Sequence, residues 1–381
     1  MSRLYSTGFE LNSATSGVEG DTHNLTSISS SVVRSGAYAL RCNAAGNTPF
    51  YRTHLFAADS SSAIGYLRAY IYIDTSMSAN TQIMRFVNSS NGPQVSIQLT
   101  TTNTLQLRNN LAVQIGSDSA ALSNDTWYRL ELSFNPATGA VEARIDGTSF
   151  ASGSTATGSW SRIIVGVITG TPTGDMYVDD VAVNDDSGSF QNTWPGSGKI
   201  IVLKPNAAGD NTGLTTGVSD NTNHYLNVDE VTPDDDTSYN QTSTASQIDD
   251  YNLEASGLGA SDIINVVAVG VRYRKVTSGT LVFKVRAKAA AAGTVEASPN
   301  ISSATTTFST NAEATPKLYP LTMYDLPGAS TTPWSTADLD QAQIGVETVS
   351  NTANNWRFTK IWMLVEYVPN ASPNPTNLFF F

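Results

Sequence analysis

The sequence predicts an all-β protein made of two β-sandwich domains in tandem. Three compositional observations lead to this prediction: Ser, Thr and Asn make up 119 of the 381 residues, charged residues only 14%, and hydrophobic residues 40%. Such a chain is poor in helix formers and rich in turn formers, which excludes a helical bundle. It is nevertheless apolar enough to bury a sizeable core. At roughly 150 residues per domain, its length allows two domains.

A change in composition places the domain boundary near residue 187. Residues 1–185 contain ten Arg and no Lys, whereas all seven Lys lie beyond them. At the same place the segment Asn184–Ser189 has no apolar residue, which is typical of a linker. We therefore expect a first sandwich over residues 1–186, a second over 187–370, and an extended C-terminal tail over 371–381.

Alternating apolar and polar residues predict many short strands in the first part. In Trp127–Phe134, for example, every second residue is apolar, and the pair Asp146-Gly147 suits the tight turn of a hairpin. The other predicted strands are Ala37–Arg41, Gly65–Asp74, Gln82–Val87, Val95–Thr100, Ala140–Asp146, Ile163–Ile168 and Met176–Val183. Short, half-buried strands in this number are typical of two antiparallel sheets packed face to face.

The second part shows longer strand signals. The run Ile361–Val365 is apolar throughout, which predicts a strand buried on both faces. One short helix is predicted at Thr336–Gln341, with Ser335 as its N-cap. The predicted strands are Ile263–Val276, Leu281–Lys288, Lys317–Tyr324, Ile344–Val349 and Trp356–Val368.

Short motifs in the first part resemble the concanavalin A-like (laminin-G-like) jelly-roll superfamily. In chain order, they are Gly8-Phe9-Glu10, Ser35–Leu40, Trp127–Leu132, Pro136–Gly139, Asp146-Gly147 and Tyr177–Val183. The resemblance covers about residues 5–185 and implies a lectin-type jelly roll. Motifs of the second part resemble modules that follow lectin-like domains in structural proteins of tailed bacteriophages: Gly188–Phe190, Trp194–Gly196, Pro205–Asp210 and Asp234–Tyr239. This second resemblance implies a virion component.

No arrangement of side chains predicts catalysis. Retaining glycoside hydrolysis needs two carboxylates about 5–5.5 Å apart, and inverting hydrolysis needs them about 6.5–9.5 Å apart. Acids at alternate positions of a strand can provide such a pair. Asp179 and Asp180 are adjacent, so we expect them to face opposite sides of their strand. The lone Cys42 is interpreted as a buried thiol. The histidines, none of which has metal-ligand spacing with another, are His23, His54 and His224. We therefore predict a protein that is not an enzyme, with a glycan hydrolase as a minor alternative because lectin-like jelly rolls also host such enzymes.

Two sets of residues are candidates for binding. In Gly65–Asp74 the alternation projects four side chains to one face, where they could bind a glycan or a partner protein: Tyr66, Arg68, Tyr70 and Tyr72. No cofactor is required by the sequence. The jelly-roll resemblance implies one candidate structural calcium site, with Glu10 and Asp179 as ligands and Glu19 or Asp21 as a further one.

The functional prediction is a bacteriophage virion protein that decorates the capsid and exposes its lectin-like domain. The alternative is a tail-fibre or receptor-binding protein that recognises host glycans through residues 1–185. The expected partners are other virion proteins and further copies of the chain, preferably as a trimer, with host glycans as possible ligands. The net charge of −12 argues against nucleic acid and membrane surfaces as partners.

The two ends of the chain carry two further expectations. The first residues lack the apolar stretch of a signal peptide, so we expect assembly in the host cytoplasm and residence in the virion. The C-terminal residues Leu378, Phe379, Phe380 and Phe381 are predicted to anchor the protein to a neighbouring subunit.

Overall fold

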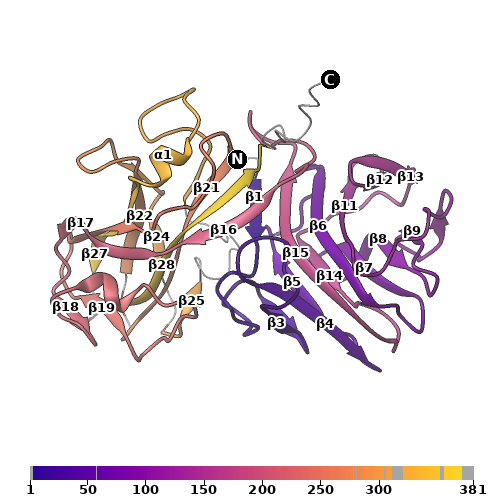
Figure 1. Cartoon of the computed structure of the whole chain (residues 1–381), viewed down its shortest axis with the longest axis horizontal. Helices are drawn as coiled ribbons and strands as arrows, with labels where there is room; N and C mark the ends of the chain where they lie inside the picture. Colours follow the sequence, from indigo (N-terminus) through magenta and orange to yellow (C-terminus); the bar gives the residue numbers. More distant parts are fainter. Residues whose placement is uncertain are drawn as a thin grey trace, which may run out of the picture.

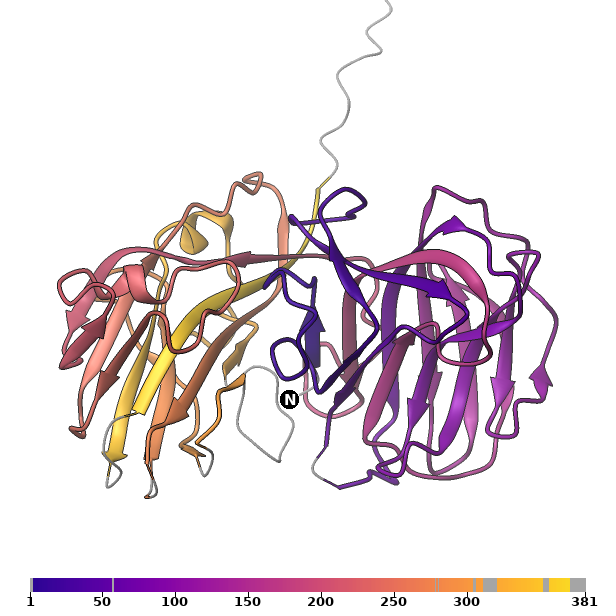
Figure 2. The same ribbon diagram turned by 90° about the horizontal axis from the view of Figure 1, so that it is seen from below.

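The computed structural model describes residues 3–370 apart from residues 57, 278, 280, 304–305, 311–320 and 352–355. The strands of this part form four antiparallel sheets, which pack in pairs as two β-sandwiches. Figures 1 and 2 show the sandwiches side by side, the first in indigo to magenta and the second in pink to yellow. The predicted all-β fold class is confirmed.

Sheets A and B form the first sandwich. The neighbouring strands of sheet A are, in order, β13 (Thr148–Ser154), β12 (Ala140–Ile145), β11 (Trp127–Phe134), β6 (Gly65–Thr75), β15 (Thr173–Asp185), β4 (Ala39–Ala45) and β3 (Ser27–Ser29), and β1 (Arg3–Thr7) pairs with β15. Those of sheet B are β10 (Gln114–Ile115), β9 (Leu105–Asn109), β8 (Pro93–Leu99), β7 (Thr81–Val87), β14 (Arg162–Gly166), β5 (Phe50–His54) and β2 (Thr22–Asn24).

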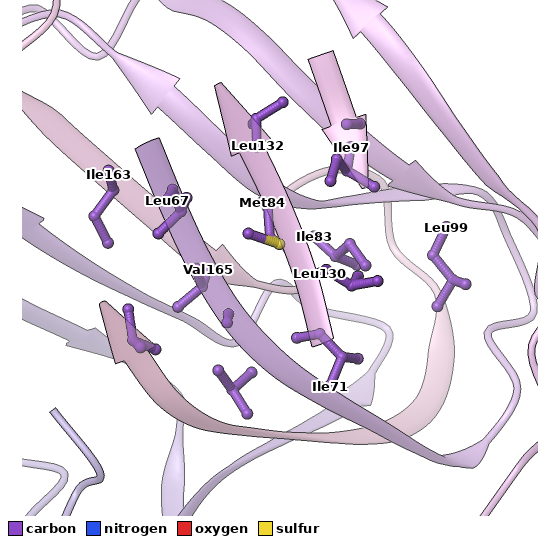
Figure 3. Packing of buried hydrophobic residues seen from close by; sticks show 14 of the residues in the cluster. Leu67, Ile71, Ile83, Met84, Ile97, Leu99, Leu130, Leu132, Ile163 and Val165 are labelled. Atoms are coloured by element: carbon purple, nitrogen blue, oxygen red, sulfur yellow. The ribbon is translucent and has the colours of Figure 1, made fainter. Parts of the chain in front are cut away.

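The core of the first sandwich lies between these sheets and follows the predicted alternation. Along β6, Leu67, Ala69, Ile71 and Ile73 are fully buried, while the residues between them point outward. Figure 3 shows Leu67 and Ile71 packed among apolar side chains of both sheets. The hairpin turn between β12 and β13 is also as predicted, because Asp146 and Gly147 both have positive φ.

Sheets C and D form the second sandwich. The neighbouring strands of sheet C are β18 (Thr216–Val218), β19 (Tyr239–Thr242), β28 (Trp356–Val368), β21 (Ile263–Lys275) and β25 (Ser309–Thr310); β16 (Lys199–Leu203) pairs with β28 and β26 (Leu321–Met323) with β21. Those of sheet D are β17 (Pro205–Thr212), β20 (Ile248–Leu253), β27 (Gln343–Asn351), β22 (Leu281–Lys288) and β23 (Glu296–Ala297), and β24 (Ile301–Ser303) pairs with β22. A 3₁₀ turn, η1, spans His224–Asn227.

Two local predictions for the second sandwich are confirmed. The helix α1 (Thr336–Leu339) begins after Ser335, whose side chain accepts a hydrogen bond from the backbone of Asp338 in a capping box. Strand β28 is buried on both faces: Ile361, Met363 and Val365 belong to the core between sheets C and D. The alternate residues of β28 face the first sandwich.

An apolar cluster joins the two sandwiches. Leu11 and Val18 of the first sandwich pack with Trp362 and Leu364 on the outer face of β28. A methyl group on Gly270, in the neighbouring β21, would lie 2.2 Å from the Trp362 ring, so this position needs glycine. Figure 1 shows β1 and β16 at the same junction.

A buried ion-pair cluster lies beside the apolar contact. The Glu366 carboxylate, on β28, pairs with the guanidinium groups of Arg3, on β1, and Arg68, on β6. The Arg68 Nη1 to Glu366 Oε1 distance is 3.0 Å, and all three side chains are buried. Because these groups come from both sandwiches, they hold the outer face of sheet A against the outer face of sheet C. The boundary proposed near residue 187 stays a prediction.

Candidate functional site

The four candidate residues of β6 all project from the outer face of sheet A, as the alternation predicted. They do not share one environment. Arg68 is fully buried and Tyr70 is 6% exposed, whereas Tyr66 and Tyr72, at the two ends of the strand, are half-buried.

The centre of this face is covered by other parts of the chain. Arg68 donates to Glu366 of the second sandwich and, through Nε, to the backbone oxygen of Asp180 at 3.0 Å. The guanidinium carbon of Arg34 lies 3.2 Å from the centre of the Tyr70 ring, a cation–π contact. A ligand could reach Arg68 or Tyr70 only by displacing these contacts, so the two residues serve the junction between the sandwiches.

The Tyr72 end of the face presents a row of aromatic rings. Trp127, on β11, and Tyr177, on β15, are the direct cross-strand neighbours of Tyr72. The ring centres of Tyr72 and Trp127 are 5.4 Å apart, and those of Tyr72 and Tyr177 are 5.9 Å apart. Tyr72 and Trp127 are half-buried and Tyr177 is nearly covered, so the first two offer the accessible ring surface.

Polar groups border this aromatic row. Arg41, on β4, is the cross-strand neighbour of Tyr177, and its side chain is 41% exposed. Its Nε donates to Asp175 Oδ2 at 2.9 Å, while Asp175 Oδ1 has no hydrogen-bond partner. At the other side, the Tyr72 hydroxyl donates to Asp125 at 3.0 Å. Rings with donors and acceptors at their margin form the kind of surface that binds sugars, since aromatic faces pack against pyranose rings while polar groups bind hydroxyls.

The opposite end of β6 has a different aromatic contact. The Tyr66 and Trp194 rings lie 5.4 Å apart, and the Arg144 guanidinium carbon lies 3.9 Å from the Trp194 ring centre. Trp194 belongs to the connector between the sandwiches, which also contacts sheet A where the Gly196 amide donates to Glu131. Tyr66 thus lies next to the connector, away from the Tyr72 row.

The candidate calcium ligands lie next to each other in the fold but already accept hydrogen bonds. Glu10 accepts from the amides of Ala37 and Tyr38, and Asp179 accepts from the amides of Arg34 and Ser35. Burial raises the pKa of Glu10 to about 8 and the pKa of Asp179 well above its usual value.

A calcium ion at this place stays a prediction. Over the part of the chain that the structure describes, no group of three or more His, Cys, Asp or Glu side chains is placed to hold a metal ion. Glu19, the further candidate, accepts from Thr7 and from the Leu11 amide, and burial raises its pKa to about 7. If calcium binds here, a chelator should lower the melting temperature of the original protein. The same chelator should leave the melting temperature of the Glu10→Gln variant unchanged.

The expected orientation of Asp179 and Asp180 is wrong. Asp180 has a φ of 48°, and the pairing of β15 with β6 is irregular between Asp179 and Ala182, as in a β-bulge. Both carboxylates therefore contact the same segment: Asp179 accepts from the Arg34 and Ser35 amides, and Asp180 accepts from the Ser35 hydroxyl at 2.6 Å. Burial raises the pKa of both carboxyl groups, and repulsion from Asp180 adds to the rise for Asp179.

Other residues singled out in the sequence are placed as follows. Cys42 lies within β4 and is buried, which raises the pKa of its thiol to about 12 and confirms the interpretation as a core residue. His224 is not isolated in space, because its Nδ1 lies 2.7 Å from Asp249. The predicted anchor, Leu378 to Phe381, lies outside the described residues. No helix in the described ranges is long and apolar enough to cross a membrane.

Comparisons with known proteins give weak likenesses to solved structures. No family model matches the chain, and no curated protein matches it. A cellulose induced protein, Cip1, has a TM-score of 0.38 and 13% identity over 51% of this chain and 99% of its own. A Trypanosoma rangeli sialidase has a TM-score of 0.33 and 15% identity over 45% of this chain and only 29% of its own. We infer no activity from likenesses at this level, and neither resemblance stated from the sequence is confirmed by them.

The sialidases among these structures contradict one prediction. We predicted a protein that is not an enzyme, whereas the solved structures to which part of this chain is similar include sialidases. The exclusion also rested partly on the expected separation of Asp179 and Asp180, which the bulge in β15 removes. The prediction that the protein is not an enzyme is therefore not upheld.

Sequence reasoning missed the residues that complete the aromatic row. Trp127 and Tyr177 both lie in predicted strands, and their outward positions follow from the alternation. Their proximity to Tyr72 depends on the order and register of β11, β6 and β15, which a single sequence does not specify.

Proposed function

We propose that the protein binds a glycan on the outer face of sheet A. The observation that carries this proposal is the row formed by Trp127, Tyr72 and Tyr177 on three adjacent strands. Two half-buried rings at its accessible end offer a surface for the apolar face of a sugar, and the rigid sheet holds them in place before binding. Side chains that are already ordered lose little conformational entropy when a ligand binds, so rings on a sheet bind a sugar at a lower entropic cost than rings on a flexible loop.

Polar groups at the margin fix the orientation of the sugar. Arg41 offers guanidinium N–H donors from a side chain that remains 41% exposed. Its ion pair with Asp175 keeps the guanidinium beside Tyr177. Asp125, already bonded to the Tyr72 hydroxyl, offers carboxylate oxygen atoms to sugar hydroxyls on the other side.

Alanine substitutions of aromatic residues on sheet A test the site. After a glycan array has identified a ligand, Tyr72→Ala and Trp127→Ala should each weaken its binding by roughly 5- to 30-fold, because each removes an aromatic contact of about 1–2 kcal/mol. Tyr66→Ala is the matched control, since Tyr66 projects from the same face of β6 but packs against Trp194. Equal losses for Tyr66→Ala and Tyr72→Ala, or no loss for Tyr72→Ala, would contradict the proposal.

We propose further that the protein acts as part of a bacteriophage particle. This proposal rests on the motifs between residues 188 and 370 that resemble modules of phage structural proteins. Decoration of the capsid is our first choice, with other virion proteins and further copies of the chain as partners. A tail-fibre protein is the alternative. Copy number distinguishes them: hundreds of copies per particle support decoration, and a few dozen or fewer support a tail location.

A further inference from the structure

The outer face of sheet B, opposite the aromatic row, carries a row of arginines. Arg52, on β5, Arg85, on β7, and Arg108, on β9, lie at the same level of the sheet, with Ile164 and Ser96 between them on the intervening strands. Arg162 lies two residues before Ile164, on β14. We call these four residues the sheet B arginine face. They alternate along their strands with residues of the core, so the sheet itself fixes their outward direction.

The sheet B arginine face lacks the carboxylate partners that other arginines of this chain have. The sequence contains 14 arginines, and in the described part of the chain ten of them make an ion pair with Asp or Glu. The remaining four are those of this face. Asp21 and Asp59 interact electrostatically with Arg162, and Asp118 with Arg108.

The hydrogen bonds of these arginines go to neutral acceptors. Arg52 and Arg162 both donate to the Asn91 side chain, at 3.1 and 2.9 Å. Arg85 donates to Gln82, and Arg108 to Gln106 and a backbone oxygen. The Nε atoms of all four are buried and have no hydrogen-bond partner. Burial without a counter-charge is unfavourable for a cation, and it lowers the pKa of Arg85 to about 10.

Amide and hydroxyl groups lie beside the row. Gln82, Gln98 and Gln106 are cross-strand neighbours on β7, β8 and β9, and Gln98 donates to Gln106 at 3.1 Å. Ser96 lies between Arg85 and Arg108. Guanidinium groups bind carboxylates in a planar, two-point manner, and side-chain amides bind hydroxyls.

We infer that the sheet B arginine face binds an anionic polysaccharide that runs across the strands. Arg52, Arg85 and Arg108 lie on alternate strands, so their backbone positions are separated by about 9–10 Å. A linear glycan with an acidic group on every second sugar has a charge repeat of similar length. A nucleic acid fits less well, because its phosphates follow one another more closely than the arginine positions do. This second site is independent of the aromatic row on sheet A.

Binding of defined polysaccharides to the full-length protein tests the inference. The probes are a hyaluronan decasaccharide (carboxylate on every second sugar), heparin of equal length (sulfate and carboxylate), a neutral cello-oligosaccharide and single-stranded DNA. We expect hyaluronan or heparin to bind at low salt, to weaken as salt rises, and to raise the melting temperature. Arg85→Gln and Arg52→Gln should each weaken this binding by roughly tenfold.

Two controls keep the test decisive. Arg144→Gln removes an arginine of sheet A that is paired with Glu142, and it should leave anionic-glycan binding unchanged. Arg85→Gln should melt no lower than the original protein, because it removes a partly buried cation that makes no ion pair with a carboxylate in the described part of the chain. Hyaluronan binding without heparin binding assigns carboxylate as the recognised group, and the reverse assigns sulfate; both support the site. The inference is overturned if the neutral oligosaccharide or DNA binds as tightly as the anionic glycans, if neither anionic glycan binds, or if Arg85→Gln binds normally.

Discussion

Replacing Glu366 by Gln tests the junction between the sandwiches. In the described part of the chain, Arg3 and Arg68 have no carboxylate other than Glu366 within ion-pair distance. Glu366→Gln keeps the shape of the side chain but leaves two buried guanidinium groups without a counter-charge. Removing one partner of a buried ion pair typically lowers the free energy of unfolding by about 3–5 kcal/mol.

The pKa of Glu366 gives a second route to the same magnitude. The two arginines, despite the opposing effect of burial, lower this pKa from 4.5 to about 2. Lowering the pKa from 4.5 to about 2 corresponds to roughly 3 kcal/mol of stabilisation of the folded state. Because the folded-state pKa lies below the unfolded one, this stability is fully present above pH 4.5 and is lost as the pH falls toward 2.

Denaturant unfolding of the full-length protein measures the effect. At pH 7, Glu366→Gln should lower the free energy of unfolding of the first transition by about 3 kcal/mol. It should also remove the part of the acid sensitivity that arises between pH 4.5 and 2. Glu347→Gln is the matched control, because Glu347 pairs with Arg286 at 3.5 Å from a side chain that is 31% exposed, and such pairs contribute about 0–1 kcal/mol. If the two variants lose equally little stability, the ion-pair cluster does not hold the junction.

Two further predictions concern buried positions. Gly270→Ala should lower the free energy of unfolding by about 1–3 kcal/mol, because the new methyl group meets the Trp362 ring. Gly259→Ala should change it little, because a methyl group there would lie 3.5 Å from Asp262, an ordinary van der Waals distance. Equal melting temperatures for the two variants would refute this. Glu10 should make the protein less stable at pH 9 than at pH 5, because its stabilising contribution is full below pH 4.5 and is lost as the pH rises through about 8. Glu10→Gln should reduce this alkaline loss, and an identical pH profile for the variant would show that Glu10 does not titrate in this range.

Local patterns predicted the strands because side-chain alternation is a property of the strand itself. Trp127–Phe134, Leu281–Lys288 and Trp356–Val368 begin and end where the sequence predicts. The same holds for the Ser335 cap, which needs only residues one turn apart. Strand bounds and helix caps depend on residues that are close together along the chain, so they can be predicted from a single sequence.

The surfaces that surround the candidate sites depend on contacts between distant residues. Arg68 and Glu366 are 298 positions apart, and nothing near either one indicates that the second sandwich covers the centre of β6. The bulge at Asp180 arises from a positive φ at a residue other than glycine, which alternation does not predict. Arg52, Arg85 and Arg108 form a row only because β5, β14, β7, β8 and β9 adopt one register.

A crystal structure of the full-length protein with an array-selected oligosaccharide is the most direct test of glycan binding on sheet A. We predict a sugar ring in contact with the Tyr72 and Trp127 rings, with a hydroxyl within hydrogen-bond distance of Arg41 or Asp125. An oligosaccharide held elsewhere, with the Tyr72 end of sheet A in contact with solvent alone, would contradict the proposal.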